Sequence, residues 1–195
     1  DVQIGIEPLM SPYREWFEAQ DLRPAYAYYR DLLKLLDSQR PGRRWLLKSP
    51  AHLWALDVLV ELFADCSIVQ THRDPREILA SYCSMMGALM SIRETYDKVE
   101  LGRAVLDHLA TAIARGMRAR DASDPARFID VDYRVFLDDP MATVERIYGH
   151  FARPLERDVA AAIRAHVAAN PQSKHGRHDY SLAEYGLDAE TVRAR

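Results

Sequence analysis

Hydrophobic residues follow two different periods along this chain, and together they predict alternating strands and helices. Short apolar runs typical of buried parallel strands occupy 45–48 (WLLK), 67–71 (SIVQT) and 127–133 (RFIDVDY). Apolar residues spaced three and four positions apart predict helices over 24–39, 53–63, 76–90, 103–119 and 156–168, and another that begins at Asp139-Pro140. Strands separated by helices predict an α/β fold in which helices flank a parallel sheet.

One helix also shows which of its faces should be buried. Over 76–90 the periodic stripe that we expect to face the core contains Ile78, Tyr82, Met85, Met86 and Leu89. Ser81 lies off this stripe, so the pattern leaves its hydroxyl available to a ligand.

Two junctions between a strand and a helix carry a cation followed by a helix-start signal. Ser49-Pro50 and Asp74-Pro75 each read as an N-cap residue followed by proline at the first helical position, and Glu77 would complete a capping box with Asp74. Lys48 and Arg73 should therefore lie at the carboxyl ends of neighbouring strands, where open α/β sheets bind ligands and helix N-termini favour anions. The alternative is a pair of well-capped connections in which Arg73 only pairs with a local carboxylate.

Motifs along nearly the whole chain resemble one family in sequence and in order. They are WLLKSP-x-H at 45–52, THRDP at 71–75, VDY-x-x-FL-x-DP at 131–140 and YSL-x-EYGL at 180–187. This set is similar to the sulfotransferases that use 3′-phosphoadenosine 5′-phosphosulfate (PAPS), in the bacterial-type branch. The resemblance implies a P-loop-kinase-like sulfotransferase fold and transfer of a sulfuryl group from PAPS to a hydroxyl or amine.

The resemblance also implies which residues hold the nucleotide. In the family, an arginine that ends a strand and a serine eight residues later grip the 3′-phosphate, and Arg73 and Ser81 have that spacing. A planar guanidinium suits bidentate contact with phosphate, and a hydroxyl adds a donor. Tyr133 matches a position that contacts adenine, although a packing tyrosine is the alternative.

A basic, glycine-containing loop near the end of the chain matches the family's second contact with the 3′-phosphate. Lys174, Gly176, Arg177 and His178 are its candidate residues. Glycine allows close backbone approach to phosphate. The alternatives are a solvated basic loop and, less favoured, a metal site, which we do not expect because no carboxylate or cysteine has a supporting spacing.

Two residues are candidates for the chemical step. Relatives with lysine at the end of the strand that matches 45–48 use it near the transferred group, which suggests this role for Lys48; a salt bridge to Asp57 or Glu61 is the alternative. A neutral imidazole at His52 could accept the acceptor's proton, or it could only pack or cap the helix start. His72 alternates away from Arg73 and is expected to be structural.

The family's first strand and its 5′-phosphosulfate loop have no counterpart in this sequence. No glycine opens a phosphate-binding pattern, and the chain does not begin with Met. We therefore expect residues 1–195 to form a single sulfotransferase-like domain that is the carboxyl-terminal part of a longer enzyme, with the fold incomplete at its N-terminus.

Composition excludes few of the possible functions and locations of the protein. A net charge of −3 suggests no nucleic-acid partner, two cysteines suggest no disulfide framework, and no apolar run is long enough to span a membrane. We expect a cytoplasmic protein with a small-molecule, glycan or lipid acceptor; homo-oligomerisation stays open. The rival hypotheses are a kinase-like phosphotransferase and a non-catalytic nucleotide-binding or interaction module.

Overall fold

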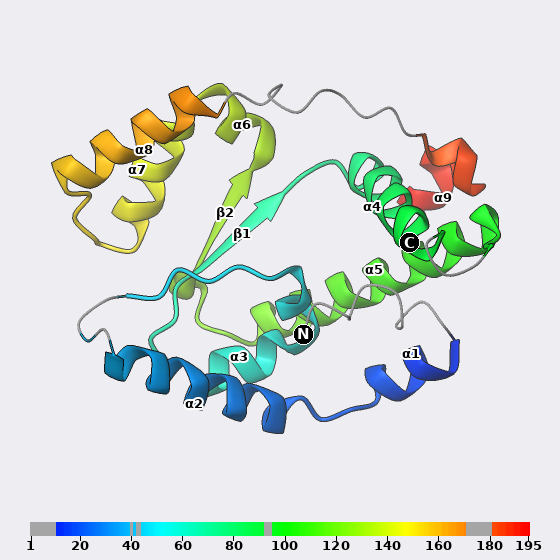
Figure 1. Ribbon diagram of the computed structural model, residues 1–195, viewed down its shortest axis with the longest axis horizontal. Coiled ribbons are helices and arrows are strands. Elements are labelled where there is room, and N and C mark those ends of the chain that lie inside the picture. Colours follow the sequence, from blue (N-terminus) through cyan, green and yellow to red (C-terminus); the bar gives the residue numbers. More distant parts are fainter. Residues whose placement is uncertain (1–10, 40, 42–43, 92–94, 171–180) are drawn as a thin grey trace.

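Two parallel strands lie at the centre of the protein, with helices around them (Figure 1). The computed structural model describes residues 11–39, 41, 44–91, 95–170 and 181–195. Strand β1 (Ile68–His72) pairs in parallel with β2 (Phe128–Asp132), in a register that runs from Ile68 opposite Phe128 to His72 opposite Asp132. The parallel sheet and two of its three predicted strands are thus confirmed.

The helices begin close to the positions that proline and capping residues predict. In chain order they are α1 (Ser11–Glu18), α2 (Arg23–Gln39), η3 (Pro50–Ala55), α3 (Leu56–Leu62), α4 (Pro75–Met90), α5 (Lys98–Asp121), η4 (Pro125–Arg127), α6 (Tyr133–Asp138), α7 (Pro140–His150), α8 (Arg157–Ala169), η5 (Leu182–Tyr185) and α9 (Ala189–Arg193). The predicted helix 53–63 is divided, because its first turn is the 3₁₀ helix η3, capped by the Ser49 hydroxyl.

The predicted strand at 45–48 is wrong. Residues 44–49 have no strand assignment, and the side chains of WLLK are exposed, with Leu46 at 98%. A strand needs a neighbour to pair with its backbone groups, and β1 pairs only with β2 in the part of the chain that the structure describes. The expectation that Lys48 ends a buried strand is therefore wrong, and the Lys48 side chain is exposed.

The core forms where α4, α5 and the C-terminal turns meet. Its buried members come from all three: Leu79, Cys83, Met86, Leu101, Val105, Leu106, Tyr185, Leu187 and Val192. At Gly102 an added Cβ would lie 2.2 Å from the backbone oxygen of Tyr185, so α5 and η5 touch there backbone to backbone. This close approach anchors the C-terminal segment to α5.

The buried face of α4 is rotated relative to the predicted stripe. Leu79, Ala80, Cys83, Met86 and Gly87 are buried, whereas Ile78, Met85 and Leu89, which the pattern had placed inward, are 38–50% exposed. α4 carries apolar residues on two sides, so its sequence alone does not decide which side α5 covers.

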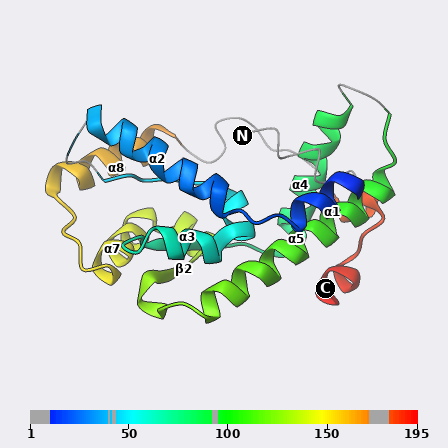
Figure 2. The same cartoon turned by 90° about the horizontal axis from the view of Figure 1, so that it is seen from below.

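The remaining helices pack in two groups. α2 lies on α3 and α3 on α5, which gives the stack seen in Figure 2. α7 packs against β2 and against α8 on the other side of the strands (Figure 1). The carboxyl ends of β1 and β2, which lead into α4 and α6, lie at one shared edge.

Candidate nucleotide-binding site

Arg73 and Tyr133 meet at the carboxyl edge of the sheet. Each is the first residue after its strand, and the parallel register places them on the same face. The Arg73 guanidinium carbon lies 5.1 Å from the centroid of the Tyr133 ring, which is a cation–π distance. Two residues that the sequence assigned to one nucleotide, 60 positions apart, are therefore in contact.

Glu77 links this pair to a second arginine. Its carboxylate accepts a 2.9 Å hydrogen bond from Nε of Arg73 and a 3.0 Å bond from an Nη of Arg134, the residue after Tyr133. These two arginines, Arg73 first, hold the pKa of Glu77 below its usual value. Half of the predicted capping box is therefore wrong: Asp74 caps α4 by accepting from the Arg76 N–H, but the carboxylate of Glu77 binds arginine side chains instead.

Ser81 lies on the same side of α4 as Glu77. It follows Glu77 by four residues, which places the two side chains on one helical face, one turn apart. Ser81 is half-buried. Glu77 and Ser81 therefore share one side of the first two turns of α4, and Arg73, which precedes the helix, reaches this side through its bond to Glu77.

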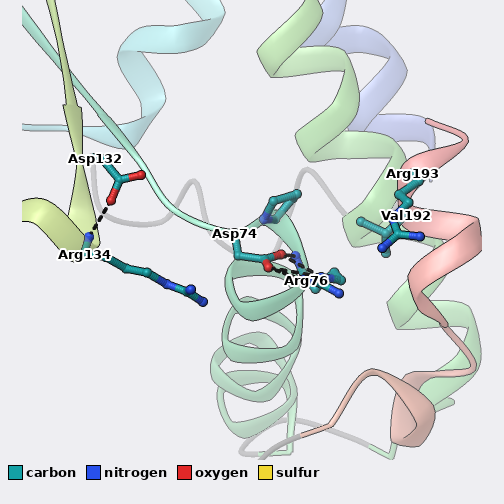
Figure 3. Close-up of a pocket in the computed structure, with 7 residues that line it drawn as sticks. Asp74, Arg76, Asp132, Arg134, Val192 and Arg193 are labelled. Atoms are coloured by element: carbon teal, nitrogen blue, oxygen red, sulfur yellow. Dashed lines mark hydrogen bonds and ion pairs between the residues drawn. The ribbon is translucent and has the colours of Figure 1, made fainter.

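A hollow of about 420 Å³ adjoins this edge, and Figure 3 shows the side chains around it. Asp74, Pro75 and Arg76 line it from α4, Asp132 and Arg134 from the start of α6, and Val192 and Arg193 from α9. Arg76 pairs with Asp74, which holds the pKa of that carboxyl well below its usual range. No sequence motif singles out Arg76, Arg134 or Arg193, and only the fold brings Arg193 on α9 next to the N-terminus of α4.

His52 lies against α2 rather than beside Arg73. Its Nδ1 is 2.8 Å from the hydroxyl of Tyr26, and its ring also contacts that of Tyr29, at 6.2 Å between centroids. Burial in this aromatic cluster lowers the pKa of His52, so its imidazole is neutral at physiological pH. The backbone bond from His52 N–H to Ser49 O closes one turn, which keeps His52 next to the segment that carries Lys48.

Glu61, one of the two carboxylates that could have formed a salt bridge with Lys48, has a different partner. Glu61 instead pairs with Arg23, at 3.3 Å. The predicted loop residues Lys174, Gly176, Arg177 and His178 lie outside the described residues.

His72 lies on the opposite face of the sheet from Arg73, as its alternation predicts. Its Nε2 is 2.5 Å from the carboxylate of Asp130, which also accepts two bonds from Arg120. Arg120 in turn donates to the side chain of Gln70. This network ties α5 to both strands and is structural. Among the described residues, no helix is both long enough and apolar enough to cross a membrane.

The chain belongs to the sulfotransferase family, whose model matches residues 4–157. Among solved structures, it is similar to sulfotransferase STF1 from Mycobacterium tuberculosis, with 34% identity and a TM-score of 0.78, and to sulfotransferase STF9 from Mycobacterium avium, with 30% identity and a TM-score of 0.83. Each likeness covers 93% of this chain and 47% of the other. The α/β architecture with its parallel sheet is accordingly that of a sulfotransferase fold.

Curated relatives agree with this assignment. The chain is 25% identical over 146 residues to the omega-hydroxy-beta-dihydromenaquinone-9 sulfotransferases Stf3 of Mycobacterium bovis and Mycobacterium tuberculosis. The alignment covers 71% of this chain and 37% of either relative, so the chain spans well under half the length of the relatives that it matches.

Proposed function

We propose that this protein is a sulfotransferase that moves a sulfuryl group from PAPS to a hydroxyl or amine of its acceptor. The observation that carries the proposal is the contact between Arg73 and Tyr133 at the carboxyl edge of the parallel strands. Family membership supports the reaction class. The edge itself supports a nucleotide ligand, because two helix N-termini and several arginines meet there.

In this proposal, the nucleotide is held mainly through its 3′-phosphate. Arg73 presents its guanidinium to the phosphate while Glu77 fixes its orientation, and the Ser81 hydroxyl adds a donor. The Tyr133 ring faces adenine. Lys174, Gly176, Arg177 and His178 complete the contact with the 3′-phosphate.

The chemical step is an in-line displacement at sulfur. The acceptor's oxygen or nitrogen forms a bond to sulfur while the bond from sulfur to the bridging phosphate oxygen breaks, and adenosine 3′,5′-bisphosphate leaves. Lys48 stabilises the negative charge that grows on the leaving oxygen. Neutral His52 accepts the proton that the acceptor loses. No metal ion is needed in this scheme.

The acceptor belongs to the broad class of small molecules, glycans and lipids that carry a hydroxyl or amine. The matched Stf3 proteins are named for a hydroxylated dihydromenaquinone, which favours testing hydroxylated lipids first. A cytoplasmic location is part of the proposal, since Cys66 and Cys83 are both free thiols.

Calorimetric titration with adenosine 3′,5′-bisphosphate, with 5′-AMP as the comparison ligand, tests the proposal. The wild-type protein should prefer the bisphosphate. Arg73→Ala should weaken bisphosphate binding about 10- to 100-fold, since a charged hydrogen bond contributes about 1.5–3 kcal/mol, and should change AMP binding far less.

Arg164→Ala is the matched control. Arg164 is an exposed arginine on α8 whose partner is Glu145, so its removal makes the same change in charge away from the site. It should leave both affinities unchanged. Equal losses for the two nucleotides in Arg73→Ala would refute the 3′-phosphate assignment.

A further inference from the structure

A second arginine, Arg134, reaches across the edge of the sheet to the helix that follows Arg73. It is the second residue of α6, and Figure 3 shows its side chain extending from α6 toward α4. An Nη of Arg134 lies 3.0 Å from Oε1 of Glu77, whose Oε2 accepts the 2.9 Å bond from Nε of Arg73. The two arginines therefore bind different oxygens of one carboxylate.

Bonds to both oxygens fix the orientation of the Glu77 side chain. A glutamate on an exposed helix face samples several rotamers, and one ion pair at a spacing of four residues restricts it only weakly. The bond from Arg134 comes from another element and holds the second oxygen. Glu77 thus presents Oε2 to Arg73 in one geometry, and the guanidinium of Arg73 is held where it contacts Tyr133.

The backbone at the start of α6 holds Arg134 in place. The Asp132 carboxylate accepts hydrogen bonds from the backbone N–H groups of Arg134 and Val135, at 2.8 and 3.2 Å. This cap follows β2 directly, and β2 is paired with β1 along its full length. The ion pair between Arg134 and Glu77 is therefore anchored to the sheet at one end and to α4 at the other.

We propose that Arg134 is a positioning residue for the nucleotide site: by holding Glu77, it fixes the Arg73 guanidinium at the angle that bidentate contact with a 3′-phosphate requires. This role deepens the proposed function and rests on it, whereas the geometry of the three side chains does not. The Arg134 side chain is 72% exposed, and exposed ion pairs contribute little to stability. Its removal should therefore change ligand affinity rather than folding.

A double-mutant cycle, measured by calorimetric titration with adenosine 3′,5′-bisphosphate, tests this role. Arg134→Gln should weaken bisphosphate binding about three- to tenfold, since residues in one hydrogen-bonded network are coupled to this extent. In a Glu77→Ala background the same substitution should change the affinity less than about twofold, because the bond through which Arg134 acts is already lost. An equal loss in both backgrounds would show that Arg134 contacts the ligand or acts by its charge alone, and would overturn the proposal.

Arg164→Gln is the matched control for the cycle. Arg164 is an exposed arginine on α8 whose partner is also a glutamate, Glu145, away from the site. Its substitution should leave bisphosphate affinity unchanged in both backgrounds. Urea denaturation of each variant checks that it is folded, and Arg134→Gln should have the midpoint of the wild type.

A measurement without ligand separates this inference from the proposed function. The Nε–H of Arg73, which is bonded to Glu77, gives a ¹H–¹⁵N signal that Arg73→Lys assigns. Hydrogen exchange at this group should be faster in Arg134→Gln and unchanged in Arg164→Gln. If exchange responds in this way but no variant prefers the bisphosphate to 5′-AMP, the positioning of Arg73 stands and the sulfotransferase proposal fails. If the wild type prefers the bisphosphate but exchange is unchanged in Arg134→Gln, the positioning role fails and the proposed function stands.

Discussion

Lowering the pH should destabilise this protein in part through a buried histidine, His108 on α5. Only 6% of its surface is exposed, and its Nδ1 has no hydrogen-bond partner among the described residues. Its ring lies against that of Trp54, at 4.8 Å between centroids and a tilt of 37°. Burial, and secondarily the charge of Arg14, lower the pKa of His108 from 6.5 to about 4. The folded protein therefore holds His108 neutral at pH values where the unfolded chain would protonate it.

The sign and the size of the effect follow from linkage. Between pH 6.5 and about 4 the unfolded state binds the extra proton, so the free energy of unfolding falls as the pH falls through this window. Above pH 6.5 the stability contributed by neutral His108 is fully present. An interval of about 2.5 pH units, at about 1.36 kcal/mol per unit, sets an upper bound of about 3 kcal/mol on the loss.

Urea denaturation followed by circular dichroism, at pH values between 7.5 and 4, measures this loss. His108→Phe keeps an aromatic ring against Trp54 and cannot titrate. The free energy of unfolding of the wild type, relative to that of the variant, should therefore fall as the pH falls. His150→Phe, at the exposed end of α7, is the control and should follow the wild type. Parallel pH profiles for His108→Phe and the wild type would refute the reasoning.

Three further substitutions test the packing and capping of the helices. Gly102→Ala would place a Cβ 2.2 Å from the backbone oxygen of Tyr185, so it should lower the free energy of unfolding by more than about 2 kcal/mol. Gly149→Ala on α7 has nothing within 4 Å of its added Cβ and should raise the free energy of unfolding by up to about 1 kcal/mol. Equal urea midpoints for the two variants would contradict this reasoning. Asp74→Ala removes the cap of α4 and the partner of Arg76, so it should lower the free energy of unfolding by about 0.5–2 kcal/mol, and a value unchanged in urea titrations would show that the cap contributes nothing.

The sequence alone determined the features that depend on neighbouring residues. Both observed strands are short apolar runs, and α4 begins at Asp74-Pro75 because an N-cap carboxylate and a proline act within one turn. The spacing of Arg73 and Ser81 is equally local, since Arg73 directly precedes the N-cap of α4 and Ser81 lies in the second turn of that helix. These signals also carried the family resemblance, which the comparison with known sulfotransferases confirms.

Only the tertiary structure decided which distant residues meet. The sequence predicts that Glu77 completes a capping box, but its carboxylate instead accepts hydrogen bonds from Arg73 and from Arg134, which is 57 positions away. His52 finds Tyr26 on another helix, and the 45–48 run is no strand because pairing requires a neighbour that its own residues cannot specify. Secondary-structure propensity depends on residues within a few positions of one another. The partners of a charged side chain, an aromatic ring or a strand depend on how the whole chain packs.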